Sequence, residues 1–131
     1  MSSVVALIVD DSMVIRHTVC RFLEERGFAV ECASNGLEAI AVLKRVCPGL
    51  IITDLQMPEM GGSELITVLK SRPETANIPV VIVTGRSKGY DASETRAQFT
   101  IFKDIDIEQQ LEAALASTMN GRAAKGQASA K

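Results

Sequence analysis

Residues 50–62 read Leu50-Ile51-Ile52-Thr53-Asp54-Leu55-Gln56-Met57-Pro58-Glu59-Met60-Gly61-Gly62, an apolar run that ends at one carboxylate and then continues into a loop. A short apolar, β-branched run between turn-forming residues is typical of a strand buried on both faces, as in a parallel sheet covered by helices. Ligands bind outside the carboxyl ends of the strands in open α/β sheets, so Asp54 is a candidate site residue. The alternative is an Asp that only caps a turn, because Asp is common where loops start.

Length and charge limit the class of protein. The 131 residues suffice for one domain whose core needs no disulfide or metal. The 14 Lys and Arg residues against 16 Asp and Glu residues give a formal net charge of −2, so we expect no direct binding of nucleic acid. Residues 1–9 have no cationic start followed by a long apolar core, and no apolar run approaches the ~20 residues of a membrane span. We expect a cytoplasmic protein without membrane insertion.

The cysteines, Cys20, Cys32 and Cys47, are odd in number, lie within apolar patterns and form no C-x-x-C pair. Such spacing does not favour a disulfide framework or a zinc site. We predict that all three are buried thiols.

Strand-like and helix-like patterns alternate along the chain. The predicted strands are Val4–Val9, Phe28–Ala33, Leu50–Thr53, Val80–Val83 and Thr100–Phe102. Helices are predicted over about residues 13–26, between Asn35 and Pro48, between Gly61 and Pro73, and over about residues 107–118. The second of these helices has an apolar stripe of Leu37, Ile40, Leu43 and Cys47. Residues 85–98 are polar and predict only a short helix around Ser93–Gln98.

Five strands alternating with helices, without an internal repeat, indicate one parallel sheet covered on both faces, a doubly wound α/β fold. The predicted domain spans residues 1–118. Residues 119–131 are mostly Gly, Ala, Ser and Lys, a composition that cannot bury a core. We expect them to form a disordered tail or the start of a linker.

Polar residues follow four of the predicted strands: Asp10 and Asp11, then Asp54, Thr84 and Lys103. Because all strands of a parallel sheet end at the same edge, these residues should converge although they lie far apart in the sequence. The sequence therefore predicts a pocket that holds three carboxylates, one hydroxyl group and one ammonium group.

Three carboxylates within a few ångströms repel one another unless a cation neutralises them. Mg²⁺ is the natural cation, because it binds carboxylate oxygens and leaves room for a phosphate oxygen. Lys103 and the metal could neutralise an incoming phosphoryl group while Thr84 donates a hydrogen bond to it. Asp54 would then be the in-line nucleophile that forms an acyl phosphate.

The pattern over residues 4–118 resembles the receiver domain of two-component response regulators, including chemotaxis receivers. The matching motifs are Asp10-Asp11, Asp54 with Met57-Pro58 and Gly61-Gly62, Thr84-Gly85 and Lys103. The resemblance implies a flavodoxin-like sheet with strand order 2-1-3-4-5. It also implies Asp54 as phosphoacceptor, Asp10 and Asp11 as metal ligands completed by the backbone carbonyl of Gln56, and Thr84 and Lys103 as the phosphoryl-binding pair.

The sequence departs from the family pattern near Lys103. Asp104 stands where the family usually has a proline, and Thr100 where it usually has an aromatic switch residue. The interval from Thr84 to Lys103 is short, as though the fourth helix of the family had lost a turn.

The resemblance implies a signalling domain rather than a turnover enzyme. It would take a phosphoryl group from a phosphohistidine on a sensor kinase or a histidine phosphotransfer domain, and then change its binding to an unknown downstream protein. The departures at Asp104 and Thr100 motivate an alternative, a receiver-fold adaptor that works without phosphate. A phosphatase with an Asp nucleophile is less favoured because such enzymes resemble D-x-D, where this chain has Gln56. A flavin site is disfavoured because Asp10-Asp11 would repel its phosphate.

Overall fold

The five strands form one parallel sheet in the order β2-β1-β3-β4-β5, which confirms the predicted fold and strand order. The computed structural model describes residues 4–85, 96–103 and 106–119. In chain order the elements are β1 (Val5–Val9), α1 (Met13–Glu24), β2 (Ala29–Ala33), α2 (Gly36–Leu43), β3 (Leu50–Thr53), α3 (Gly62–Lys70), β4 (Val80–Thr84), β5 (Phe99–Phe102) and α4 (Ile107–Met119).

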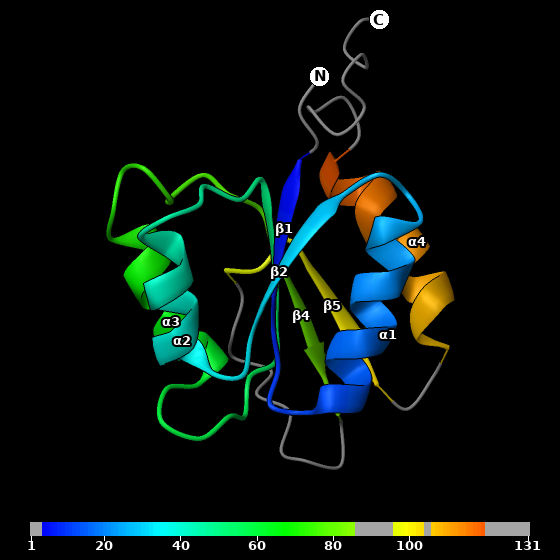
Figure 1. Cartoon of the computed structure of the whole chain (residues 1–131), viewed down its shortest axis with the longest axis horizontal. Helices are drawn as coiled ribbons and strands as arrows, with labels where there is room; N and C mark the ends of the chain where they lie inside the picture. The colour runs from blue at the N-terminus through cyan, green and yellow to red at the C-terminus, as the bar shows by residue number, and fades with distance from the viewer. Residues whose placement is uncertain (1–3, 86–95, 104–105, 120–131) are drawn as a thin grey trace, which may run out of the picture.

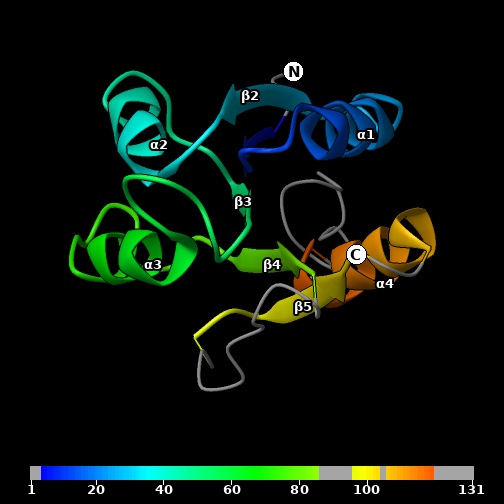
Figure 2. The same cartoon turned by 90° about the horizontal axis from the view of Figure 1, so that it is seen from below.

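Two layers of helices enclose the sheet. Figure 1 shows α1 and α4 on one face and α2 and α3 on the other, and Figure 2 shows the strands between the two layers. Ile8 and Ile52 pack in the core that includes side chains of α1 and α4, whereas Leu7 and Ile51 pack in the core on the other face. Every residue of β3 and β4 is buried because both of their faces are covered, which accounts for their continuous apolar sequences.

Strand register places Asp10 and Asp54 side by side. Val9, the last residue of β1, pairs with Thr53, the last residue of β3. Asp10 and Asp54 follow these two residues, and the Asp54 N–H donates to the Val9 carbonyl over 2.9 Å. The two carboxylates therefore start from neighbouring positions at the carboxyl edge of the sheet.

The other half of the sheet brings Thr84 and Lys103 to the same edge. Thr84 pairs with Phe102, and the next residue, Lys103, donates its N–H to the Thr84 carbonyl over 2.9 Å. The arrow of β4 points downward in Figure 1, so this edge is the lower end of the sheet in that view.

Side chains cap the N-termini of two helices, α1 and α2. The Ser12 Oγ accepts a hydrogen bond from the Ile15 N–H over 3.3 Å at the start of α1, and Asn35 Oδ1 accepts from the Glu38 N–H over 2.9 Å at the start of α2. Glu38 Oε1 accepts in turn from the Ser34 N–H over 2.8 Å. These side chains satisfy N–H groups that a helix N-terminus leaves without partners.

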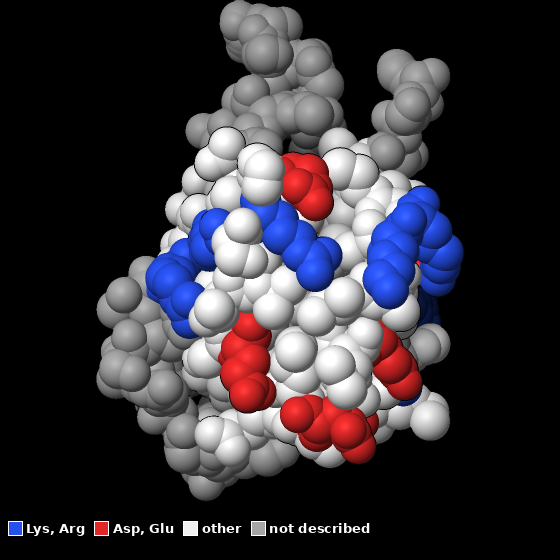
Figure 3. Space-filling view, turned by 90° about the vertical axis from the view of Figure 1, so that its left-hand side faces the viewer, with Lys and Arg blue, Asp and Glu red and all other residues white. Residues whose placement is uncertain are grey.

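On the face formed by α2 and α3, acidic side chains lie near the N-termini of the helices and basic ones near the C-terminus of α3. Glu38 and Glu64 lie in the first turns of α2 and α3, and Lys70 lies in the last turn of α3. Figure 3 shows acidic side chains gathered on the lower half of this face and mainly basic ones above them. This arrangement stabilises both helices because acids favour the positive N-terminal end of the helix dipole and bases its negative C-terminal end.

The predicted apolar stripe of α2 is confirmed only in part, because Ile40 and Leu43 pack against the core but Leu37 and Cys47 are exposed. Leu37 is 50% exposed, and the helix ends at Leu43, so Cys47 lies beyond it. The buried positions are Gly36, Ala39 and Val42. The segment is apolar on most sides, so its periodicity allowed more than one buried face, and packing of the small Ala39 against the core decided between them.

The prediction of three buried thiols is also wrong for two cysteines. Cys20 is buried, but Cys32 and Cys47 are exposed. Cys32 lies in β2, a strand at the edge of the sheet, and Cys47 lies in the loop between α2 and β3. Apolar neighbours in the sequence therefore did not ensure burial at these positions.

Element ends differ slightly from prediction. The first helix ends at Glu24 rather than near residue 26, and Gly27 then reverses the chain with φ +91°. Residues 96–98 of the predicted short helix are not helical, while Ser93 to residue 95 lie outside the described residues. The predicted tail starts at residue 119, but Met119 is the last residue of α4. Residues 120–131 and the predicted shortening of the family's fourth helix fall outside the described residues. None of the described helices is long and apolar enough to cross a membrane.

Candidate functional site

Three carboxylates meet at the carboxyl edge of the sheet. Asp10, Asp11 and Asp54 each offer an oxygen atom, and these oxygens lie within 4.8 Å of one another. Asp10 and Asp54 are only 1% exposed, whereas Asp11 is exposed to solvent. Clustered oxygen ligands with one open side suit a hard divalent cation such as Mg²⁺. The structure thus brings together the three acids that the sequence predicted.

Lys103 lies between the two buried acids. Its Nζ donates to Asp54 Oδ2 over 2.8 Å and to Asp10 Oδ1 over 3.3 Å, and it lies 3.0 Å from Asp10 Oδ2. Burial of the ammonium group lowers its pKa, but the hydrogen bonds to Asp54 and Asp10 outweigh this effect and raise the pKa of Lys103. The amine is therefore a fixed positive charge at neutral pH.

Asp10 is held in place but is not fully neutralised. Its Oδ1 accepts a hydrogen bond from the Ser12 N–H over 2.8 Å, whereas Oδ2 has the ion-pair contact with Lys103 at 3.0 Å but no hydrogen bond of regular geometry among the described residues. Burial raises the pKa of Asp10, and the nearby charge of Asp54 raises it further against the lowering effects of Ser12 and Lys103. Among the described residues Lys103 is the one ammonium group that pairs with these acids, which leaves the site favourable to a further cation.

The backbone around Asp54 fixes its carboxylate. Asp54 Oδ1 accepts from the Leu55 N–H over 2.7 Å, and the Thr53 hydroxyl donates to the Asp54 carbonyl over 2.8 Å. Gly62 at the start of α3 packs against this peptide, and a Cβ atom at Gly62 would lie 2.1 Å from the Asp54 carbonyl oxygen. The Gly61-Gly62 motif therefore permits close approach of the helix to the strand end.

Thr84 ends the strand beside Asp54 and carries an unused hydroxyl group. Its Oγ1 is buried and has no hydrogen-bond partner in the described part of the chain. A buried hydroxyl without a partner is costly, so it indicates a site that a ligand oxygen can complete. Gln56 lies in the exposed loop after Asp54, and its backbone carbonyl as a metal ligand stays a prediction.

Sequence reasoning missed Arg16. Its Nη1 donates to the main-chain carbonyl of Asp10 over 2.7 Å. The sequence also did not predict that Ser12, besides capping α1, donates its N–H to the Asp10 carboxylate. The only available signal was an arginine about one turn into the helix that follows the acid pair, and a helical arginine is too common to be diagnostic.

Comparison with known proteins agrees with this geometry. The family description of the response regulator receiver domain matches residues 6–116. Response regulator Rre1 of Synechocystis is 37% identical over 81 residues, which cover 61% of this chain and 35% of that protein. The solved signal receiver domain of a signal transduction histidine kinase from Syntrophus aciditrophicus is 32% identical with a TM-score of 0.79, over 91% of this chain and 92% of that one. Chemotaxis response regulator CheY4 of Vibrio cholerae is 27% identical with a TM-score of 0.76, over 88% of this chain and 99% of that one.

The matched region covers most of this chain but only part of several relatives. The chain spans between 11% and 65% of the length of the first curated relatives that it matches. Within the matched region the parallel sheet and its strand order agree with the family match. The chain belongs to the family of response regulator receiver domains.

Proposed function

We propose that this receiver domain accepts a phosphoryl group on Asp54 and that phosphorylation changes its binding to a partner protein. The observation that carries the proposal is the position of the Asp54 carboxylate. It is almost completely buried, it is held by Lys103 and the Leu55 N–H, and it lies against two further carboxylates. A buried carboxylate of fixed orientation is a suitable nucleophile for phosphoryl transfer.

Mg²⁺ fits the acidic cluster. Asp10, Asp11 and Asp54 supply oxygen ligands, and the raised pKa of Asp10 reflects burial and repulsion that a divalent cation would relieve. When bound, the ion supplies positive charge for the oxygens of the phosphoryl group. The Gln56 carbonyl completes the proposed ligand set.

The remaining side chains would bind the phosphoryl group. The Lys103 ammonium group, already 2.8 Å from Asp54 Oδ2, is placed to pair with an oxygen of the transferred group. The Thr84 hydroxyl, which lacks a partner among the described residues, would donate to another oxygen. Movement of Thr84 toward the phosphate would pull on the loop that follows β4 and so alter the surface presented to a partner.

The proposed donor is a phosphohistidine on a sensor histidine kinase or a histidine phosphotransfer domain. The Asp54 oxygen forms a bond to phosphorus as the bond between phosphorus and the histidine nitrogen breaks. The receiver promotes its own phosphorylation and dephosphorylation but is not a turnover enzyme. The downstream partner is a protein rather than nucleic acid.

Intact mass after incubation with acetyl phosphate, with and without Mg²⁺, tests the proposal. The native chain should gain one phosphoryl group only with Mg²⁺, and Asp54→Asn should gain none while keeping its circular dichroism spectrum. Asp11→Asn, which retains the nucleophile but removes an exposed ligand, should gain the group much more slowly. Uptake by Asp54→Asn would show that another residue is the acceptor.

The alternative is a receiver-fold adaptor that binds its partner without phosphate. Thr100 supports it, because a half-buried threonine occupies the position in β5 where the family usually has an aromatic switch residue. Asp104, the other departure, lies outside the described residues. Absence of phosphoryl uptake under every condition, with Mg²⁺ bound, would favour the adaptor.

A further inference from the structure

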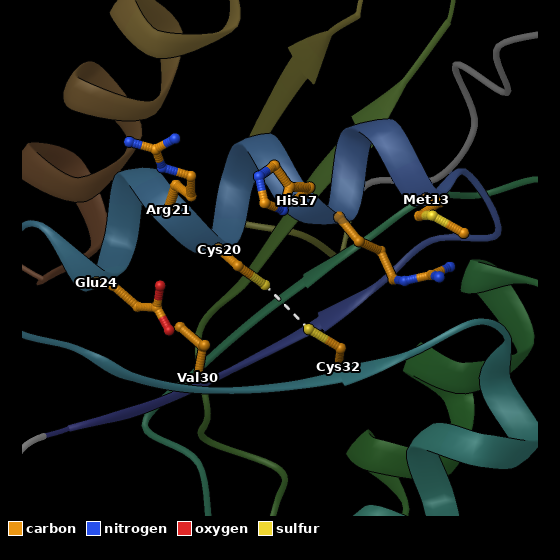
Figure 4. A pocket seen from close by; sticks show the side chains of 8 residues that line it. Met13, His17, Cys20, Arg21, Glu24, Val30 and Cys32 are labelled. Carbon is orange, nitrogen blue, oxygen red and sulfur yellow. Dashed lines mark hydrogen bonds between the residues drawn. The ribbon is translucent and has the colours of Figure 1, made fainter.

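Two cysteine side chains face each other across the gap between α1 and β2. Cys20 comes from the helix and Cys32 from the edge strand, and their sulfur atoms lie 2.9 Å apart (Figure 4). A disulfide bond is about 2.05 Å long, so the two sulfurs need to approach by only about 0.9 Å to form one. The backbone already presents the two thiols to each other.

The two thiols differ in exposure. Cys32 is exposed, while Cys20 is 9% exposed beneath it. Burial and the hydrogen bond to Cys32 raise the pKa of Cys20 to about 12, so Cys20 is held as a protonated thiol. Cys32 is therefore the first thiol that a reagent from solvent meets, and Cys20 is the neighbour that can react next.

The entrance to this pair is a hollow lined by charged side chains. It has a volume of about 340 Å³ and is lined by both cysteines together with Arg16, His17 and Arg21, and Glu24 is the one carboxylate that the described residues contribute to it. Figure 4 shows the sulfur pair between α1 and β2, with Glu24 projecting toward Val30 and Arg21 projecting from the opposite side of the helix. Arg21 also lies 3.6 Å from Glu25, but this ion pair is exposed and screened by solvent, so both guanidinium groups remain available to a small anionic reagent.

We propose that Cys20 and Cys32 are a redox modification site, which an anionic low-molecular-weight disulfide converts into a reversible internal disulfide. The Cys32 thiolate attacks one sulfur of the reagent, forms a mixed disulfide and releases the other half of the reagent as a thiolate. The Cys20 sulfur then loses its proton to solvent and attacks the Cys32 sulfur, which forms the internal bond and releases the second thiolate. The two protein thiols lose two electrons, and the reagent disulfide gains them and becomes two thiols.

Cys20 reacts second because its sulfur already contacts that of Cys32. Burial is the largest cause of the raised pKa of Cys20, followed by the hydrogen bond to Cys32 and the charges of Cys32 and Glu24, while the charge of Arg16 lowers it. A mixed disulfide on Cys32 carries no charge on its sulfur, which removes one of the causes that raise the pKa of Cys20. The second exchange is also intramolecular, which favours closure over release.

The bond would join the two segments that hold the Asp10 peptide. The Asp10 N–H donates to the carbonyl of Ala33, the residue after Cys32, over 3.1 Å. The Asp10 carbonyl accepts from Arg16, one turn before Cys20, over 2.7 Å. The modification site is thus next to the support of the acidic cluster, although formation of the disulfide does not depend on the proposed phosphorylation.

The test uses the full chain with Cys47→Ser, which removes the exposed cysteine outside the pair. The protein is equilibrated in mixtures of reduced and oxidised glutathione, alkylated with iodoacetamide and measured by intact mass. We expect one transition from a doubly alkylated form to a form with neither alkyl group nor glutathione, with the internal disulfide exceeding the glutathione adduct about tenfold because closure is intramolecular. Excess dithiothreitol should restore the doubly alkylated form.

Single variants in the same background identify the order of reaction. Cys20→Ser should accumulate one glutathione on Cys32, and Cys32→Ser should leave the buried Cys20 largely unmodified. Cys20→Ala replaces Cys20→Ser if a buried serine unfolds the chain. Independent glutathione adducts on both cysteines at every ratio, with no internal disulfide, would overturn the proposal, as would equal adduct formation in the two single variants.

Discussion

Asp10 illustrates how single residues set the properties of this site. Its carboxylate is buried beside Asp54 and shares one ammonium group, that of Lys103, with it. The charged form of Asp10 is therefore disfavoured in the folded chain when no metal is bound. The same repulsion that lowers stability without a cation makes a divalent cation favourable.

Asp10→Asn should raise the free energy of unfolding at neutral pH in the absence of Mg²⁺. Burial and Asp54 raise the pKa of Asp10 in the folded chain above about 3.9, its value in an unfolded chain. Between these two pKa values the folded protein binds more protons than the unfolded one, so native stability falls as pH rises through this window. Urea unfolding of the native chain and of Asp10→Asn should be measured from pH 4 upward. The difference between their free energies of unfolding should widen as pH rises and then level off. A difference that does not vary with pH would contradict this account.

Gly62→Ala should lower both stability and phosphoryl uptake. Its Cβ would lie 2.1 Å from the Asp54 carbonyl oxygen, so the backbone of α3 or of Asp54 must shift. We expect a loss of about 1–3 kcal/mol in the free energy of unfolding, as for other overpacked sites. Urea unfolding gives the stability, and intact mass with acetyl phosphate gives the rate of uptake.

Gly27→Ala is the matched control for this variant. Gly27 has φ +91°, but a Cβ there meets nothing within 4 Å. Gly27 follows the C-terminus of α1. Because α1 begins near the carboxyl end of β1 and runs back along the sheet, Gly27 lies at the end of the sheet opposite the acids. The control should lose stability through its strained backbone yet take up phosphate at the native rate. Equal losses of uptake in both variants would mean that Gly62 acts only through global stability.

At the scale of elements, the site depends on where helices begin. Ser12 caps α1 and, in the same turn, its N–H binds the Asp10 carboxylate. The first turn of α3 packs against Asp54 through Gly62. The junctions between strands and helices thus hold the acids, while the helix interiors supply the apolar faces that cover the sheet.

Joining α1 to β2 through the proposed disulfide should stabilise the fold. The loop that Cys20 and Cys32 would close is short, and a crosslink of this size reduces the entropy of the unfolded chain by about 3 kcal/mol in free energy. The oxidised protein with Cys47→Ser should therefore melt at a higher temperature than the reduced protein. Cys32→Ser in the same background should have the same melting temperature under oxidising and reducing conditions. An oxidised form less stable than the reduced one would show strain in the native state.

At the scale of the whole molecule, the site exists only when the sheet is assembled. Asp10, Asp54, Thr84 and Lys103 come from the ends of four strands that are far apart in the sequence. Cores on both faces hold these strands in register. A ligand of the acidic cluster therefore binds the folded chain in preference to the unfolded one and must stabilise it.

Mg²⁺ should raise the melting temperature of the native chain. At a concentration of about 100 times Kd the gain is about 2.7 kcal/mol, which corresponds to roughly 10 °C for a domain of this size. Asp11→Asn should lose most of this gain. Glu74→Gln, which removes an exposed acid outside the cluster, should retain it. Equal gains in both variants would place the stabilising cation elsewhere.

The sequence alone determined the fold class and most of the candidate site. The runs of β1, β3 and β4 are apolar up to the threonines that end β3 and β4, because both faces of the sheet are covered, so they could be recognised locally. Parallel strands end at one edge, and for this reason Asp10, Asp54 and Lys103 could be assigned to one site before their distances were known.

Only the tertiary structure decided which side chains meet across elements. The exposure of Leu37, the contact of Cys20 with Cys32 and the reach of Arg16 to Asp10 depend on how helix faces are rotated against the sheet. Periodicity in α2 allowed more than one buried face, and spacing in the sequence carries no information about two sulfurs on different elements. These features follow from packing between segments, a long-range interaction that local patterns do not encode.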